Sequence, residues 1–205
     1  MEQLNKIFNS LRENLPVVHG FKKDKFKVLI SAIISARNKD EITFKASERL
    51  FAKVKSFEDL SNLPEKQIQK LIYPTNFYRN KARYLRKLGI FMKGKKIPSD
   101  IEGLLKLPGV GRKTANLVLD VGFGKNSITV DTHVHRIFNR IGVVKTNNPY
   151  KTELELKKKI PKKYWREINK YFVNYGRNIC RPISPFCSKC FIKKYCKRIN
   201  VVKSR

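Results

Sequence analysis

The chain has 205 residues, enough for one good core or for two small ones that share an interface. Its apolar fraction of 41 % predicts a folded globule and argues against a disordered chain. Lysine and arginine total 46 against 16 acidic residues, which gives a net charge of +30. This charge predicts a polyanionic partner, with nucleic acid as the first candidate and an anionic membrane surface as the second. A lysine-rich genomic composition can account for part of the charge.

The N-terminal twenty residues carry acidic side chains and lack the apolar core of a secretory signal. No later stretch approaches the roughly 18 apolar residues of a membrane span. We therefore expect a cytoplasmic protein without a signal or transit peptide. As a binder of nucleic acid, it would be a nucleoid-associated monomer without membrane contact. Thiols stay reduced in that compartment, so the four cysteines are candidates for metal ligands rather than for disulfides.

Apolar residues at helical spacing recur along the chain. Stripes at 4–15, 26–34, 42–54 and 165–175 each predict a helix. Further helix starts are indicated by two capping-box spacings and two prolines: Ser56 with Asp59, Ser99 with Glu102, Pro149 and Pro161.

The one strand-like run, residues 128–130, is too short to build a sheet. The predicted fold class is therefore all-α, with about ten short helices and no internal repeat. A compact run of helices spans 22–128, and the chain after it carries more helices, a cysteine segment and a basic tail. The first helix can pack with either half.

Residues 107–111, LPGVG, separate two predicted helices. Gly109 and Gly111 allow positive φ and leave the backbone uncovered, so successive amide N–H groups can point outward. Amides at a helix N-terminus form an anion site that suits a phosphate. The alternative is an ordinary helix–helix turn capped by glycine.

Lys113 follows in the first turn of the second helix. The positive helix end and the nearby Arg112 both disfavour its protonated form, which is how an amine becomes a nucleophile near neutral pH. Alternatively, Lys113 binds phosphate as a point charge. Asp131 ends the apolar run 128–130 and is either an N-cap or a carboxylate that accepts a proton or stabilises positive charge on a sugar.

The four cysteines follow the spacing C-x6-C-x2-C-x5-C. Structural zinc sites more often use two C-x2-C knuckles, and this segment has one. Thiolates dispersed around a single knuckle can wrap a cubane iron–sulfur cluster. The spacing favours such a cluster and leaves zinc open as the alternative; the residues are Cys180, Cys187, Cys190 and Cys196.

Three motifs in this order, LPGVGRKTAN, VDTHVHR and the cysteine pattern, resemble the endonuclease III family of helix-hairpin-helix DNA glycosylases. FKVLISAIISARNKD and NFYRNKARYL are also similar to that family. The resemblance implies two all-α domains: a six-helix barrel at 22–128 that contains the hairpin, and a discontinuous domain of 1–21 and 129–205. The second domain would hold a [4Fe–4S] cluster on the four cysteines, with a structural and DNA-binding role.

The resemblance also implies a reaction. The lysine that matches Lys113 attacks C1′ of a damaged nucleotide, releases the base and forms a Schiff base with the sugar. β-Elimination then cleaves the strand 3′ to the lesion. Asp131 matches the aspartate that assists this lysine, and the expected phosphate contacts are Gly109, Gly111 and Arg112.

The target base must leave the stack to be reached, and a side chain must fill the vacated space. The resemblance gives this role to Phe77 or Tyr78, with residues around Arg37 filling from the other side. The alternative for Phe77 is an ordinary core aromatic. Arg37 departs from the glutamine that is usual in bacterial members, so the opposite-base preference is open. His133 is expected near the pocket.

The sequence thus predicts a bifunctional DNA glycosylase and AP lyase in base excision repair. Its substrates would be oxidised pyrimidines in double-stranded DNA, and its partners duplexes with damaged bases or abasic sites. Two rivals stay open: a mismatch-specific glycosylase that has kept the lysine, and a non-catalytic DNA-binding module. A pure binder would need neither Lys113 nor Asp131 in particular.

Overall fold

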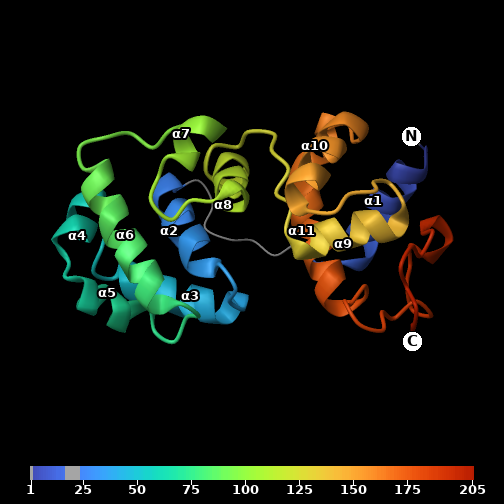
Figure 1. Cartoon of the computed structure of the whole chain (residues 1–205), viewed down its shortest axis with the longest axis horizontal. Helices are drawn as coiled ribbons and strands as arrows, with labels where there is room; N and C mark the ends of the chain where they lie inside the picture. The colour runs from blue at the N-terminus through green and yellow to red at the C-terminus, as the bar shows by residue number, and fades with distance from the viewer. Residues whose placement is uncertain (1, 17–23) are drawn as a thin grey trace. The chain divides into compact units, whose positions relative to one another are not determined.

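A computed structural model describes residues 2–16 and 24–205 (Figure 1). These residues form eleven α-helices and no β-strand, as the all-α prediction requires. The chain divides into two compact units, Gly20–Lys125 and the pair Met1–His19 with Asn126–Arg205. Within the described ranges, every helix is too short or too polar to cross a bilayer.

The unit Gly20–Lys125 is a bundle whose centre is helix α2. Its core consists of fully buried aliphatic side chains such as Leu29, Ile34 and Leu50. Helix α2 packs against α3 and η1, and α6 packs against α4 and α5. The elements are α2 (Lys25–Ser35), α3 (Asp40–Phe51), α4 (Phe57–Asn62), α5 (Glu65–Ile72), α6 (Tyr78–Met92), α7 (Ile101–Leu105), α8 (Arg112–Leu117) and the π-helical turn η1 (Val118–Gly122).

The other unit joins the first helix of the chain to the last. Three buried rings form its centre, with the Phe172 centroid 5.7 Å from that of Phe8 and 4.5 Å from that of Phe138. The first helix, which the sequence left free to join either half, packs against α11 here. The elements are α1 (Glu2–Asn14), α9 (Thr132–Ile141), α10 (Pro149–Lys159), the 3₁₀ turns η2 (Lys162–Tyr164) and η3 (Lys193–Tyr195), and α11 (Trp165–Asn178).

One predicted capping box is confirmed and the other is wrong. Ser56 accepts a bond from the Asp59 amide at 3.1 Å, and the Asp59 carboxylate accepts one from the Ser56 amide at 3.1 Å. Helix α7 starts instead at Asp100, whose carboxylate accepts a bond from the Gly103 amide at 2.7 Å. Ser99 is occupied elsewhere, because its carbonyl and hydroxyl contact the Lys125 ammonium.

The expected helix start at Pro149 and the expected lack of a sheet at 128–130 are both found in the structure. Pro149 is the first residue of α10, behind the N-cap Asn148. The run 128–130 forms no strand; it is an extended, buried connection into α9, with Ile128 and Val130 in the core.

Candidate functional site

The glycine segment is a tight turn anchored at two points in the core. Leu107 and Val110 are buried, and the Val110 amide donates to the Leu107 carbonyl at 3.1 Å. Gly109 has φ +77°, and a Cβ at this position would lie 2.8 Å from the Cβ of Tyr84. Backbone conformation and packing therefore both require glycine at 109.

Gly111 has a different reason to be glycine. Its φ is −94°, so the positive φ that glycine allows is not used at this position. It is the N-cap of α8 and offers no side-chain capping bond, and a Cβ built on it would meet nothing within 4 Å. What glycine supplies here is an uncovered backbone in front of the first amides of α8, the feature that the phosphate prediction needs.

Lys113 is the second residue of α8, after Arg112, and its side chain is exposed. It therefore lies in the first helical turn beyond the glycine segment, where the sequence placed it. Arg112 is partly exposed. The geometry gives an accessible primary amine beside open backbone amides.

Asp131 is the N-cap of α9. Its Oδ1 accepts bonds from the amides of His133 and Val134, both at 2.9 Å. The capping alternative is thus realised, and both capping bonds use the same carboxylate oxygen. Capping does not occupy the whole carboxylate, so it leaves room for a second role.

The two histidines of α9 have separate partners. His133 Nδ1 lies 3.2 Å from Arg136 Nη2, and burial lowers the pKa of the His133 ring. His135 Nδ1 lies 2.7 Å from the hydroxyl of Thr152. Over the part of the chain that the structure describes, no three His, Cys, Asp or Glu side chains are placed to hold one metal ion.

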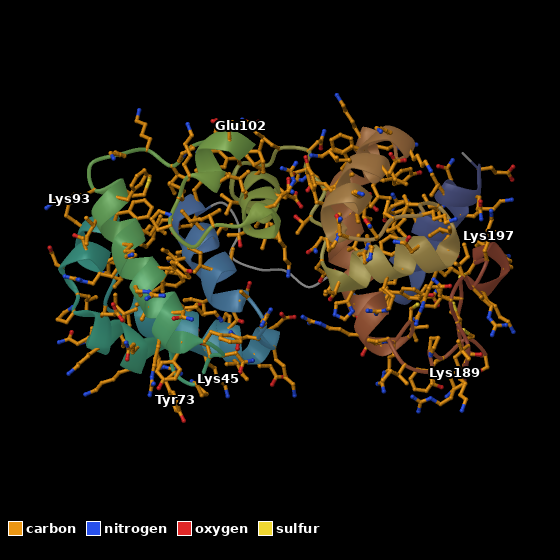
Figure 2. All side chains as sticks on the ribbon, in the orientation of Figure 1. Lys45, Tyr73, Lys93, Glu102, Lys189 and Lys197 are labelled. Carbon is orange, nitrogen blue, oxygen red and sulfur yellow. The ribbon has the colours of Figure 1, made fainter. Side chains whose placement is uncertain are left out.

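Arg37 and Phe77 come together although they lie on different loops. Both have left-handed backbones, with φ +59° and +58°, and the Arg37 guanidinium carbon lies 5.2 Å from the Phe77 ring centroid. Phe77 is 56 % exposed, so the core-aromatic alternative is wrong. Tyr78 instead packs against the core and lies 5.5 Å, edge to face, from Tyr73, which projects from the unit in Figure 2.

The four cysteines gather around one cavity in the unit that contains α9 and α11. All four thiols are free of disulfides. Two donors point at sulfur: Arg140 Nη1 lies 3.4 Å from Cys180 Sγ, and the Arg198 amide nitrogen lies 3.4 Å from Cys196 Sγ. The cavity is lined by Arg140, Tyr175, Ile179, Cys180, Pro185, Phe186, Cys187, Cys190, Lys193, Cys196, Arg198 and Val201.

A third donor reaches this cavity from α11. The hydroxyl of the buried Tyr175 lies 2.9 Å from Cys190 Sγ. Burial raises the pKa of this hydroxyl, so it keeps its proton and can donate it to a thiolate. Cationic and N–H or O–H donors aimed at several sulfurs suit a thiolate-bound centre.

Sequence analysis missed two buried cations, Lys81 and Arg140, which are 5 % and 8 % exposed. Lys81 stands at helical spacing from the buried Leu85 and Leu88 of α6, so a charge within an apolar stripe was the available signal. Arg140 carries no such clear signal, because its partners are the carbonyls of Arg181 and Pro182, distant in sequence.

Comparison with known proteins gives one family throughout. Residues 30–162 match the family model described as "HhH-GPD superfamily base excision DNA repair protein". The chain is 46 % identical over 177 residues to "Endonuclease III" of Thermotoga maritima, covering 85 % of this chain and 83 % of the relative.

Two solved structures are similar over almost the whole chain. "Structure of a Trapped Endonuclease III-DNA Covalent Intermediate: Estranged-Adenine Complex" matches with TM-score 0.85 and 32 % identity, over 96 % of this chain and 95 % of that one. "Structure of a thermostable thymine-DNA glycosylase" matches with TM-score 0.83 and 26 % identity, over 95 % and 94 %.

Proposed function

Because the chain belongs to the HhH-GPD superfamily of base excision DNA repair proteins, we propose that it is a bifunctional DNA glycosylase and AP lyase acting on oxidised pyrimidines in duplex DNA. One observation carries the bifunctional part of this proposal. Lys113 presents an exposed primary amine in the first turn after the glycine segment, in a chain 46 % identical to an endonuclease III.

Lys113 is the nucleophile of the proposed reaction. Its neutral amine attacks C1′, the bond from C1′ to the base breaks, and the base leaves with the electron pair and takes up a proton. Opening of the sugar ring gives an imine between Nζ and C1′. Loss of a C2′ proton then expels the 3′-phosphate by β-elimination, and water hydrolyses the imine to restore the lysine.

Asp131 and the glycine segment support this chemistry. The Asp131 carboxylate stabilises the positive charge that develops on the sugar, or accepts a proton. Its capping bonds to α9 fix its direction. The open amides beyond Gly111, together with Arg112, bind a phosphate of the DNA backbone.

Arg37 and Phe77 fill the space that a flipped nucleotide vacates. A glycosidic carbon is inaccessible in a stacked duplex, so the damaged nucleotide must be extruded at a cost of a few kcal/mol. The exposed ring of Phe77 and the guanidinium beside it offer flat surfaces for stacking against bases.

The cysteine cavity holds a [4Fe–4S] cluster on Cys180, Cys187, Cys190 and Cys196. The donors that Arg140, Arg198 and Tyr175 aim at sulfur support thiolate ligands, and the single C-x2-C knuckle within a C-x6-C-x2-C-x5-C spacing favours a cluster over zinc. The cluster would supply structural cross-linking of the C-terminal segment and no step of base removal. About four iron atoms per chain, without zinc, is the expected metal content of the brown purified protein.

Product analysis on three labelled duplexes tests the activity. One carries thymine glycol, one a G·T mismatch, and one is undamaged. We expect base release and strand cleavage without added alkali on the thymine glycol duplex. Cleavage of the undamaged duplex at the same rate, or no product from any duplex, would contradict the proposal.

The mismatch glycosylase is the second candidate function, favoured by the similarity to a thymine-DNA glycosylase. It predicts release of thymine from the G·T duplex in preference to release of thymine glycol. The same three duplexes therefore separate the two functions.

A further inference from the structure

Two exposed loops of the unit Gly20–Lys125 each present one residue in a left-handed conformation. Arg37 lies between α2 and α3, and Phe77 lies directly before α6. Residues with a Cβ adopt this conformation at an energetic cost, so the surrounding structure must enforce it. The contacts between the loops explain how.

Two asparagines join the loops by hydrogen bonds. The Asn76 amide donates to the Asn38 side-chain oxygen at 2.7 Å, and the Asn76 side chain donates to the Arg37 carbonyl at 2.5 Å. Asn38 in turn donates to the Ile34 carbonyl at 2.7 Å, which attaches it to α2. Arg37 and Phe77 are therefore held by one shared network.

Lys81 of α6 completes this hydrogen-bond network. Its ammonium, buried in the first turns of α6, donates to the carbonyls of Ile34 at 2.6 Å and Ala36 at 2.7 Å. These carbonyls end α2, where the helix dipole favours a cation. One side chain of α6 thus fixes the end of the helix that leads into Arg37.

Burial of this ammonium is costly for folding. Its desolvation lowers the pKa of Lys81 to about 8. An apolar side chain would suit the neighbouring Leu85 and Leu88 at a smaller cost. The structure therefore gives Lys81 a task that hydrophobic packing cannot perform, namely the fixed direction of two carbonyls and the loop that follows them.

We propose that Arg37 and Phe77 form a single preassembled wedge, and that Lys81 is the positioning residue that holds it ready to enter DNA. The inference rests on the proposed function, in which an extruded nucleotide leaves a gap in the base stack for the wedge to fill. The pair enters the base stack as one unit, and its order in the free protein lowers the conformational cost of insertion.

The first experiment compares wild type, Lys81→Met and the control Lys87→Met, an exposed lysine on the same helix. Each is assayed on a thymine glycol duplex and on a single-stranded abasic oligonucleotide, which has no stack to open. We expect Lys81→Met to slow base removal from the duplex about tenfold or more. Lys81→Met should still cleave the single strand at its abasic site at the wild-type rate. Lys87→Met should keep both activities at the wild-type rate.

Full duplex activity in Lys81→Met overturns the proposal, and so does an equal loss on both substrates. Asn76→Ala, an exposed loop variant, gives the same test if Lys81→Met does not fold. A wild-type chain without either activity would refute the proposed function instead.

Insertion of the wedge into the base stack is measured by the fluorescence of 2-aminopurine, which rises when this base is unstacked. The base is placed beside an uncleavable abasic analogue, so the measurement does not depend on catalysis. The signal should rise with wild type and fall with Arg37→Ala or Phe77→Ala. The double variant should lose no more than either single variant, because the two side chains act together. Additive losses, or an unchanged signal in Lys81→Met, contradict a preassembled wedge.

Discussion

Asp131 combines a structural bond with a proposed chemical role. As the N-cap of α9 it stabilises the helix start by about 1 kcal/mol. As a carboxylate it would stabilise charge on the sugar. Asparagine keeps the capping oxygen and removes the negative charge, so one substitution separates the two roles.

We expect Asp131→Asn to leave the free energy of unfolding within about 0.5 kcal/mol of wild type, because Asn and Asp cap helices about equally well. Its turnover on a thymine glycol duplex should fall about 10²-fold or more, since the charge is lost. Urea denaturation and single-turnover kinetics measure the two effects. Wild-type turnover in this variant would make Asp131 a cap alone.

Lys81 makes folding depend on pH in a defined direction. Its pKa is about 8 in the folded chain, against a reference value of 10.5 for an exposed lysine. Between these values the unfolded chain binds a proton that the folded chain does not, so stability from this group rises as the pH rises.

We expect the free energy of unfolding of wild type to increase relative to that of Lys81→Met from about pH 8 to about pH 10.5. All other titrating groups are shared, so the difference between the two proteins isolates Lys81. Urea titrations across this range measure it. A difference that stays constant with pH would show that burial does not shift this amine.

At the scale of elements, local chemistry was predictable and long-range partners were not. The Ser56 capping box was readable because all its bonds lie within four residues. The start of α7 was placed one residue early, because Asp100 competes for the cap and Ser99 bonds to the distant Lys125. The contact of Arg37 with Phe77 likewise depends on bonds between loops about 40 positions apart, which no spacing rule reveals.

In the candidate site, too, local motifs were predictable from the sequence and long-range contacts were not. Lys113, Asp131 and the cysteines stand in motifs whose order was readable. The charge of Lys81 within an apolar stripe was a readable signal, but its partners were not readable, because backbone carbonyls have no sequence signature. Both glycines allow positive φ, but only the structure shows that Gly109 uses it and Gly111 does not.

The two glycines of the hairpin make a matched pair of substitutions. Gly109→Ala adds a Cβ that clashes with Tyr84 at 2.8 Å in a left-handed conformation, so we expect a loss of about 1–2 kcal/mol or more in stability. Gly111→Ala meets open space and should cost less than about 1 kcal/mol.

If the space at Gly111 receives a DNA phosphate, Gly111→Ala should weaken duplex binding although it folds normally. Thermal denaturation and fluorescence anisotropy with a labelled duplex measure the two quantities. Equal stability of the two variants would contradict the geometry of the turn, and unchanged affinity of Gly111→Ala would contradict the phosphate site.

The charge of the whole molecule is carried by both units. Figure 2 shows Lys45 and Lys93 projecting from one unit, and Lys189 and Lys197 from the other. A net charge of +30 distributed in this way favours contact with many phosphates, independent of sequence. Such contacts let a repair enzyme associate with undamaged duplex while it searches.

We expect the association constant for undamaged duplex to fall about a thousandfold or more between about 50 mM and 200 mM salt, as displacement of several counterions requires. Anisotropy titrations at four salt concentrations give the slope. A slope near zero would mean that the excess charge serves another purpose than DNA binding.

The central claim is that Lys113 forms a covalent imine with the sugar, and borohydride trapping tests it most directly. A labelled duplex with an abasic site is incubated with wild type, Lys113→Ala or the control Lys106→Ala, an exposed lysine of the same hairpin. We predict a reduced protein–DNA adduct with wild type and Lys106→Ala, and none with Lys113→Ala despite retained DNA binding. An adduct that persists in Lys113→Ala, or one that never forms with wild type, would contradict this assignment.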